Sequence, residues 1–388
     1  MKIINALVFD GNGFTKKEIN IKGEYISEAS SDGQTIDAAG LMAIPGFVDI
    51  HFHGAVGYDF CDGSIEGLKA IADYEAKNGV MAICPATMTY KEEKLSQIME
   101  IAFEFSNMRQ NRTATLCGIN MEGPFISSEK LGAQNPDYVM SPSVMMYKRL
   151  QEKSGNLIKL VDIAPETEGA FEFIEAVHDE VSVSIAHTCA DYDTAIKAFN
   201  SGANHVTHLF NAMPGINHRN PGPIIAAKEC GANVELICDG IHIHPAVVRF
   251  TFDYFSDDKV IIISDSMEGT GLSDGKYDLG GQTVIKEGRR AYLAEDEKTI
   301  AGSVSNLYEC FTIAVREMGI PLTSAIKAVS INPAKAIGID QSYGSIDIGK
   351  FANIILIDDS LIIKGLIVKG QQISAPEDEG RQLLGNPR

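Results

Sequence analysis

Short apolar runs alternate with amphipathic segments over most of the chain. The apolar runs, each ending in polar, glycine or proline residues, are GFVDIHFHG (46–54), VMAICPAT (80–87), TLCGINMEGP (115–124), LIKLVDIAPE (157–166), VSVSIAHT (181–188), ANHVTHLFNAMP (203–214), NVELICDG (233–240) and KVIIISDS (259–266). Continuous apolar strands separated by helices are typical of a parallel sheet covered on its outer face. Eight such units predict an α/β fold with a closed (β/α)8 TIM-like barrel, and an open doubly wound sheet is the alternative.

Segments between the apolar runs have helical periodicity. In SIEGLKAIADYEAKNG (64–79), Ser64 can cap the helix and Gly79 can end it. A second segment, KEEKLSQIMEIAFEFSNM (91–108), predicts a helix with an apolar face made of Leu95, Ile98, Met99 and Ala102.

Both ends of the chain have a different pattern, short strands broken by glycine. We predict a small β-sandwich domain formed by residues 1–45 and 340–388, with the barrel, residues 46–339, between them. The glycine-rich segment 271–300 predicts a hairpin excursion after the last barrel strand. The polar residues 375–388 are expected to fray.

Composition narrows the classes of partner. Among 388 residues, 45% are hydrophobic, which is typical of a globular protein, and the net charge is −19. This charge argues against nucleic acid or an anionic membrane as a partner, so an anionic substrate must be attracted by local positive groups or a metal.

No apolar run is long enough to span a membrane, and MKIINALVFDGNG does not resemble a signal peptide, so the sequence predicts a cytoplasmic protein. Seven cysteines without a C-x-x-C pair indicate reduced thiols that are mostly buried.

Side chains of ligand and acid–base type stand where the predicted strands end. His51 and His53, two residues apart, would share one face of a strand, although a lone H-x-H can equally be a hydrogen-bonded surface pair. Chemistry in such barrels lies at the carboxyl ends of the strands. These ends carry His51, His53, Glu122, His187, His208, Asp239 and Asp265. The five residues His51, His53, Glu122, His187 and His208 predict a metal site, and imidazole with carboxylate suits Zn²⁺ or Fe²⁺ rather than Mg²⁺ or Ca²⁺.

The motifs H-x-H, MEGPF, AHT, THLFNAM, DGIH and SDSM resemble those of the amidohydrolase superfamily, most closely the N-acetylglucosamine-6-phosphate deacetylase family. The resemblance covers nearly the whole chain, and MEGPF with THLFNAM is its specific part. It implies a (β/α)8 barrel with a small β-sandwich, a homodimer, and release of acetate from a sugar phosphate. The nearest alternative substrate is N-acetylgalactosamine 6-phosphate. A non-catalytic sugar-phosphate-binding protein is a further alternative.

Roles can be carried across by matching motifs. Glu122, His187 and His208 match the metal site present throughout the family, and His51 and His53 match a second metal position, so one or two divalent ions are implied. Asp265 would accept a proton from the attacking water and pass it to the departing amine. The substrate-binding candidates are Gln134, Asn211, Ala212, Arg219 and His242, with Arg219 as a bidentate phosphate partner, and the dimer partner can supply part of this set. His205, His218 and His244 are interpreted as structural or peripheral.

The sequence departs from the family pattern at three places. Gln134 stands where many members have a histidine that holds the acetyl carbonyl, so polarisation of that carbonyl would depend more on the metal. AGSVSNLYEC (301–310) replaces the usual leucine–threonine–methionine run and can alter the wall around the acetyl group. The fourth apolar run ends without a lysine that could be carbamylated, which argues against hydantoinase-like and dihydroorotase-like activities.

Overall fold

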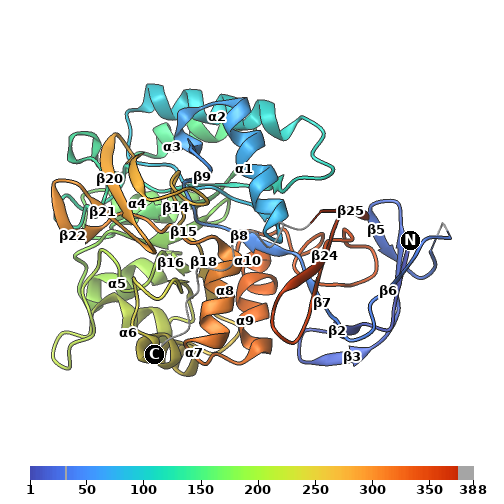
Figure 1. The fold of residues 1–388 in the computed structure, drawn as a ribbon. Helices are drawn as coiled ribbons and strands as arrows, with labels where there is room; N and C mark the ends of the chain where they lie inside the picture. The colour runs from blue at the N-terminus through green and yellow to red at the C-terminus, as the bar shows by residue number, and fades with distance from the viewer. Residues whose placement is uncertain (31–32, 375–388) are drawn as a thin grey trace.

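The structure, a computed structural model, describes residues 1–30 and 33–374. The predicted fraying of residues 375–388 therefore lies outside the described residues. Short strands from the two ends of the chain lie on one side of the molecule, and parallel strands surrounded by helices lie on the other (Figure 1). Within the described ranges, every helix is too short or too polar to cross a bilayer.

The apolar runs form parallel strands, as predicted. One sheet has the order β12-β11-β8 and another has the order β13-β14-β15-β16-β17-β18. The strands are β8 (Phe47–Asp49), β11 (Val80–Ile83), β12 (Thr115–Leu116), β13 (Ile119–Met121), β14 (Ile158–Ile163), β15 (Ser182–Ile185), β16 (His205–Val206), β17 (Asn233–Ile237) and β18 (Val260–Ile263). Nearly all their residues are buried, which explains why these runs are continuously apolar rather than alternating.

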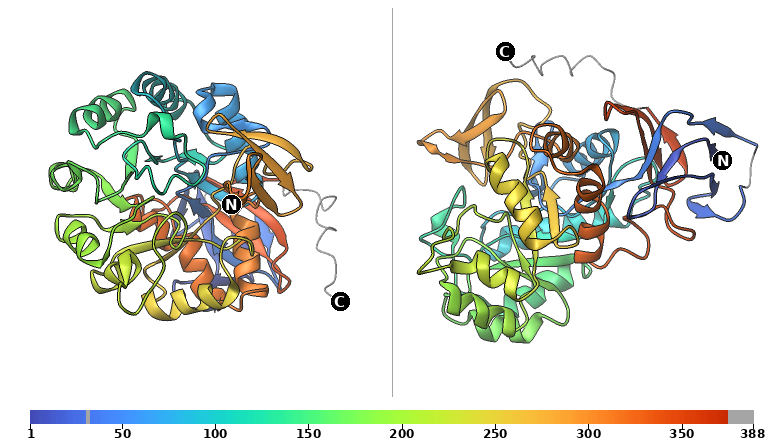
Figure 2. Two further views of the ribbon diagram at one scale, coloured as in Figure 1. Left: turned by 90° about the vertical axis from the view of Figure 1, so that its left-hand side faces the viewer. Right: turned by 90° about the horizontal axis from the view of Figure 1, so that it is seen from below.

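Hydrogen bonds beyond the strand ends link these sheets to each other. The Asn120 amide donates to the Pro85 carbonyl at 2.9 Å, and the Thr87 amide donates to the Asn120 carbonyl at 2.9 Å. Similarly, the Asp265 amide donates to the His51 carbonyl at 2.9 Å. The segment after β18 therefore lies against the segment after β8, and the helices form a ring around the strands (Figure 2, left).

The helices follow the predicted pattern of connections. They are α1 (Ile65–Lys77), α2 (Glu92–Ser106), α3 (Val144–Lys153), α4 (Ala170–Val177), α5 (Tyr192–Asn200), α6 (Gly222–Glu229), α7 (Pro245–Phe255), α8 (Leu307–Arg316), α9 (Leu322–Val329) and α10 (Ile331–Ala336), with 3₁₀ turns η1 (Phe60–Asp62) and η2 (Pro136–Tyr138). The Ser64 hydroxyl caps α1 by accepting the Gly67 amide at 3.2 Å. The predicted apolar face of α2 is buried, namely Leu95, Ile98, Met99 and Ala102.

The two ends of the chain pair with each other. One sheet has the order β5-β4-β1-β6 and a second has the order β25-β24-β23-β7-β2-β3. The strands are β1 (Lys2–Ile4), β2 (Leu7–Phe9), β3 (Phe14–Lys16), β4 (Ile19–Lys22), β5 (Tyr25–Ser27), β6 (Thr35–Asp37), β7 (Met42–Pro45), β23 (Ile354–Ile357), β24 (Ile363–Val368) and β25 (Gln371–Ile373). Buried side chains from both sheets meet in one apolar cluster that includes Ile3, Ile21, Val8 and Leu356.

The predicted excursion between 271 and 300 is larger than a hairpin. It is an antiparallel sheet in the order β19-β20-β21-β22, with strands β19 (Gly275–Leu279), β20 (Gln282–Glu287), β21 (Arg290–Leu293) and β22 (Asp296–Ile300). Another short antiparallel pair, β9 (Gly54–Ala55) and β10 (Tyr58–Asp59), follows the H-x-H segment.

Gly46, between β7 and β8, connects the terminal sheets to the parallel strands and has no room for a side chain. A Cβ atom there would lie 2.2 Å from Met81 Cγ, 2.9 Å from Met81 Cβ and 3.2 Å from Asn353 Cβ.

We expect Gly46→Ala to destabilise the protein by about 1–3 kcal/mol, because overpacking forces neighbouring atoms to move. A lower urea midpoint would show this. Gly13→Ala, where nothing lies within 4 Å of the added Cβ, is the control and should leave the midpoint unchanged. Equal midpoints for both variants would contradict the expectation.

Candidate functional site

The predicted ligand side chains gather just beyond the ends of the parallel strands. Glu122 directly follows β13, whereas His187, His208 and Asp265 each stand two residues after β15, β16 and β18. The strand prediction for 46–54 was wrong in its extent, because β8 ends at Asp49 and both histidines of H-x-H lie beyond it. Their rings nevertheless face the same group.

Glu122 is the centre of this arrangement. Its Oε1 lies 2.9 Å from His187 Nε2 and 3.3 Å from His208 Nε2. Its Oε2 lies 3.3 Å from His53 Nε2 and 3.6 Å from His51 Nε2. Among the described residues, two groups could therefore hold a metal ion, and they share this carboxylate: His51 with His53 and Glu122, and Glu122 with His187 and His208.

Asp265 stands next to the H-x-H pair. Its Oδ1 lies 3.3 Å from His53 Nε2 and 3.6 Å from His51 Nε2. Burial would raise the pKa of Asp265, but the hydrogen bond with His53 and the charges of the neighbouring imidazoles lower it below its usual value. An ionised carboxylate at this position can accept a proton.

The charges of Glu122 and His51 are mutually stabilised. Burial opposes the charged form of both groups, yet His51 and the hydrogen bonds from His187 and His208 hold the pKa of Glu122 well below its usual value. Similarly, Glu235 and Glu122 raise the pKa of His51 well above its usual value, against the effect of burial. The site therefore favours a deprotonated Glu122 beside a positively charged His51.

Glu235 is a buried carboxylate that the sequence analysis missed. It lies on β17 and is 0% exposed. Its Oε2 accepts from His51 Nδ1 at 3.0 Å, and its Oε1 accepts from His205 Nε2 at 3.0 Å. Burial alone would raise the pKa of Glu235, but His51 and the hydrogen bonds with both rings lower it to about 2. A glutamate in the middle of the apolar run NVELICDG was the signal that could have revealed it.

Hydrogen bonds at Nδ1 orient two of the four ligand histidines, His51 and His187. A ring that donates from Nδ1 keeps the lone pair of Nε2 free for a metal. The Nδ1–H of His51 is directed to Glu235, and His187 Nδ1 lies 2.8 Å from the Lys130 carbonyl. His205, predicted as structural, is buried and bonded to Glu235.

Three site residues have a strained backbone. His187, His208 and Asp265 have φ angles of 43°, 27° and 49°, a region that side chains other than glycine rarely adopt. Such strain, concentrated where functional side chains stand, is characteristic of active sites.

A cavity of about 270 Å³ opens beside Glu122 and Asp265. Predicted site residues in its lining are His53, Glu122, Gln134, His187, Asn211, Ala212, His208, His242 and Asp265. Gly302, which lies in the segment 301–310 expected to form part of the wall, lines the cavity too. The sequence analysis did not single out the other lining residues, namely Met88, Gly132, Ala133, Leu279, Lys298, Thr299 and Ile300. Leu279, Lys298, Thr299 and Ile300 come from the β19–β22 sheet, which therefore forms one wall of the cavity.

Gln134 is held by contacts with the segment after β11. Its side-chain carbonyl accepts the Thr89 amide at 2.7 Å, and its Nε2 lies 3.6 Å from the Met88 sulfur. The Thr89 amide occupies one lone pair of the Gln134 oxygen, and the Nε2–H₂ group, which contacts the Met88 sulfur, has a second N–H to donate.

The candidate phosphate residues are not all brought together in one chain. His242 lines the cavity, and its Nδ1 is bonded to Asp239 Oδ2 at 2.8 Å. Asn211 and Ala212 line it as well. Arg219 does not, because it is exposed and its guanidinium contacts His218 Nε2 at 2.8 Å. The exposed positions of His218 and His244 agree with a peripheral location.

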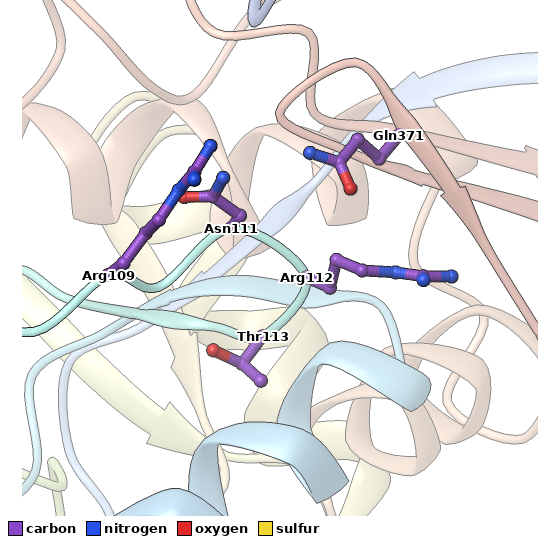
Figure 3. A pocket seen from close by; sticks show the side chains of 5 residues that line it. All are labelled: Arg109, Asn111, Arg112, Thr113 and Gln371. Carbon is purple, nitrogen blue, oxygen red and sulfur yellow. The ribbon is translucent and has the colours of Figure 1, made fainter.

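A second hollow, of about 470 Å³, lies away from these residues. It is lined by Arg109, Asn111, Arg112, Thr113 and Gln371 (Figure 3). The lining contains neither a histidine nor a carboxylate, and it joins the segment before β12 to β25. It therefore lacks the chemistry of the cavity beside Glu122.

Comparison with known proteins agrees with the motifs. The model of the amidohydrolase family matches residues 42–373. The N-acetylglucosamine-6-phosphate deacetylase of Bacillus subtilis (strain 168) is 35% identical over 336 residues, which cover 86% of this chain and 84% of that protein. The crystal structure of N-acetyl-D-glucosamine-6-phosphate deacetylase from Mycobacterium smegmatis has a TM-score of 0.89 at 27% identity, covering 96% of this chain and 100% of the other.

A second structure from Mycobacterium smegmatis is similar too, with a TM-score of 0.88 and 28% identity, covering 96% of this chain and 98% of the other. It is an aspartate-to-alanine mutant in complex with N-acetyl-D-glucosamine-6-phosphate. Since the family match extends over most of the sequence, and a relative above 30% identity covers most of its length, this chain belongs to the amidohydrolase family and groups within it with the N-acetylglucosamine-6-phosphate deacetylases.

Proposed function

We propose that this protein is a metal-dependent hydrolase that removes acetate from N-acetylglucosamine 6-phosphate, giving glucosamine 6-phosphate in amino-sugar catabolism. The observation that carries the proposal is Glu122, whose two oxygens each face a pair of imidazoles at the wall of a cavity that Asp265 also lines. The similarity to relatives named for this reaction supports the choice of substrate.

The proposal includes a domain organisation. We propose that the parallel strands of residues 46–339 close into a (β/α)8 barrel, supported by the hydrogen bond between the Asp265 amide and the His51 carbonyl. We propose further that residues 1–45 and 340–388 form a small β-sandwich, supported by the apolar cluster shared between the two terminal sheets. A cytoplasmic location remains a prediction from the sequence.

The residues of the site fit a divalent metal. His51 Nε2 and Glu122 Oε2 are buried and have no hydrogen-bond partner among the described residues. Such buried unpaired atoms are costly, and a cation between them would satisfy both. We assign Glu122, His187 and His208 to one metal position and His51, His53 and Glu122 to the other. Nitrogen and carboxylate ligands without thiolate favour Zn²⁺ or Fe²⁺, one or two per subunit.

The chemistry needs a strong nucleophile and a polarised amide carbonyl. A divalent ion at this site supplies both, because it lowers the pKa of water and withdraws charge from a carbonyl oxygen. Asp265, held near His53, accepts the proton of the attacking water on Oδ1 and delivers it to the departing sugar nitrogen. The Gln134 Nε2–H₂ group is the remaining donor beside the acetyl group.

The sugar phosphate is held at the other side of the cavity. We propose that Asn211, the Ala212 amide and His242 contact it, and that Arg219 comes from the partner subunit of a homodimer, since Arg219 does not reach the cavity of its own chain. N-acetylgalactosamine 6-phosphate differs in the orientation of one hydroxyl, so the epimers must be compared directly.

The proposed reaction is tested by acetate release from metal-loaded protein, with elemental analysis of the same sample. We expect release from N-acetylglucosamine 6-phosphate and at least one bound divalent ion per chain. Faster release from the galacto epimer would change the substrate, whereas release from neither would favour a non-catalytic sugar-phosphate-binding protein.

Asp265→Asn should keep the metal content and the binding of the sugar phosphate but reduce kcat by about 10²–10⁴-fold, because the amide cannot accept the proton. Steady-state kinetics with metal analysis measures both. Asp193→Asn, an exposed change on α5, is the control. A kcat near that of the wild type would remove Asp265 from the mechanism.

Glu235→Gln should weaken metal binding at the His51–His53 position by about 10–100-fold, because glutamine has one oxygen to serve two rings and lacks the negative charge that supports His51. Titration against a chromogenic chelator measures the affinity, and circular dichroism checks that the variant is folded. Glu180→Gln removes an exposed ion-pairing carboxylate and should leave the affinity unchanged. Unchanged affinity in folded Glu235→Gln would contradict the expected orientation of His51.

A further inference from the structure

Two carboxylates line the cavity, although its proposed substrate is an anion. Glu122 and Asp265 line it, Asp239 lies behind His242, and the chain has a net charge of −19. The overall electrostatic field therefore disfavours the approach of a phosphate, and local positive side chains or the metal must compensate.

Lys298 is the only lysine or arginine among the described residues that line this cavity. It stands on β22, and its position shows no motif of the kind that marked the other site residues. Lys298 is exposed, and the hydrogen bond that it makes to Asp296 uses its backbone amide rather than its ammonium.

Asp296 is attracted to the charge of Lys298, but the hydrogen bonds of Asp296 affect its pKa more than this attraction does. β22 carries two acidic residues, Asp296 and Glu297, and each carboxylate oxygen of Asp296 accepts a hydrogen bond. Its Oδ1 accepts the Lys298 backbone amide at 3.2 Å, and its Oδ2 accepts the Thr299 hydroxyl at 2.7 Å. The first bond holds the backbone amide of Lys298, and neither bond involves its ammonium.

Side chains of the β19–β22 sheet donate hydrogen bonds to backbone carbonyls of neighbouring segments. Gln282 Nε2 donates to the Ala133 carbonyl, next to Gln134. Arg289 donates to the Asp239 carbonyl at 2.6 Å, and Lys286 donates to the Leu272 carbonyl at 2.6 Å. Figure 1 shows β20, β21 and β22 together, at the end of the molecule away from the terminal sheets. Because the sheet is anchored on both sides, it holds Lys298 at the cavity.

We propose that Lys298 is a specificity-determining residue that binds the phosphate of the sugar phosphate from within the same chain. This inference rests on the proposed function, since it assigns a phosphate to the substrate. An ammonium acts as a flexible point charge for phosphate, unlike the bidentate guanidinium of Arg219. The phosphate would thus lie between a cation of its own chain and one of the partner subunit.

Lys298→Gln tests the inference in the full-length, metal-loaded protein. We expect KM for N-acetylglucosamine 6-phosphate to rise roughly 10-fold or more, the size typical of a hydrogen bond to a charged group, with kcat changed less than about twofold. KM for unphosphorylated N-acetylglucosamine should not change. Lys298→Arg, which keeps the charge, should restore most of the loss.

Lys276→Gln is the matched control. Lys276 lies on β19 of the same sheet, is exposed and does not line the cavity, so its removal changes the net charge equally. If both variants raise KM alike, the effect is due to bulk charge and the inference is wrong. It is also wrong if Lys298→Gln affects phosphorylated and unphosphorylated sugars equally.

A binding measurement separates this inference from the proposed reaction. Calorimetry with glucosamine 6-phosphate and glucosamine requires no turnover. If the wild-type protein releases no acetate but Lys298→Gln loses affinity for glucosamine 6-phosphate alone, the reaction is refuted and the role of Lys298 stands. If the wild-type protein does not bind glucosamine 6-phosphate more tightly than glucosamine, the inference is refuted.

Discussion

The structure depends on a single buried carboxylate, Glu122, that stays ionised. A buried charge is costly unless opposite charge and hydrogen bonds surround it. Here four imidazoles, from segments that follow β8, β15 and β16, converge on its two oxygens. These segments can meet only if the strands before them end at one edge of the sheet. The arrangement of the parallel strands is therefore what allows the imidazoles to surround the carboxylate. Glu235 extends this constraint outward, because it fixes the ring of His51 from behind.

Much of the fold could be predicted because burial on both faces produces a distinct pattern. Strands such as β17 and β18 are covered on both sides, and their sequences are correspondingly apolar. The extent of each strand was less predictable, since strand ends are decided by backbone hydrogen bonds rather than by residue type. The H-x-H segment continues an apolar run but leaves the ladder after Asp49, where its amides bond to the segment after β18.

Site residues were predictable when they were of a metal-ligand or acid–base type and also stood at the end of a predicted strand. Glu122, His187 and His208 met both conditions, and their atoms do converge. Lys298 met neither, because it reaches the cavity through the fold of the β19–β22 sheet, which only tertiary contacts define. Arg219 shows the opposite case: its motif points to phosphate, but its place in the single chain is on the surface. A motif identifies chemistry, whereas its location depends on contacts that are distant in sequence.

The backbone at the site shows what this convergence costs. His187, His208 and Asp265 have positive φ angles, each costing about 1–3 kcal/mol for a residue with a Cβ atom. Glycine would adopt the same turns without that cost, but it would supply neither an imidazole nor a carboxylate. The strain persists because the hydrogen bonds of His187 with Lys130 and Glu122, and of His208 with Glu235, hold the turns in place. The same polar contacts that orient the ligands therefore also stabilise the backbone conformations that present them to the cavity.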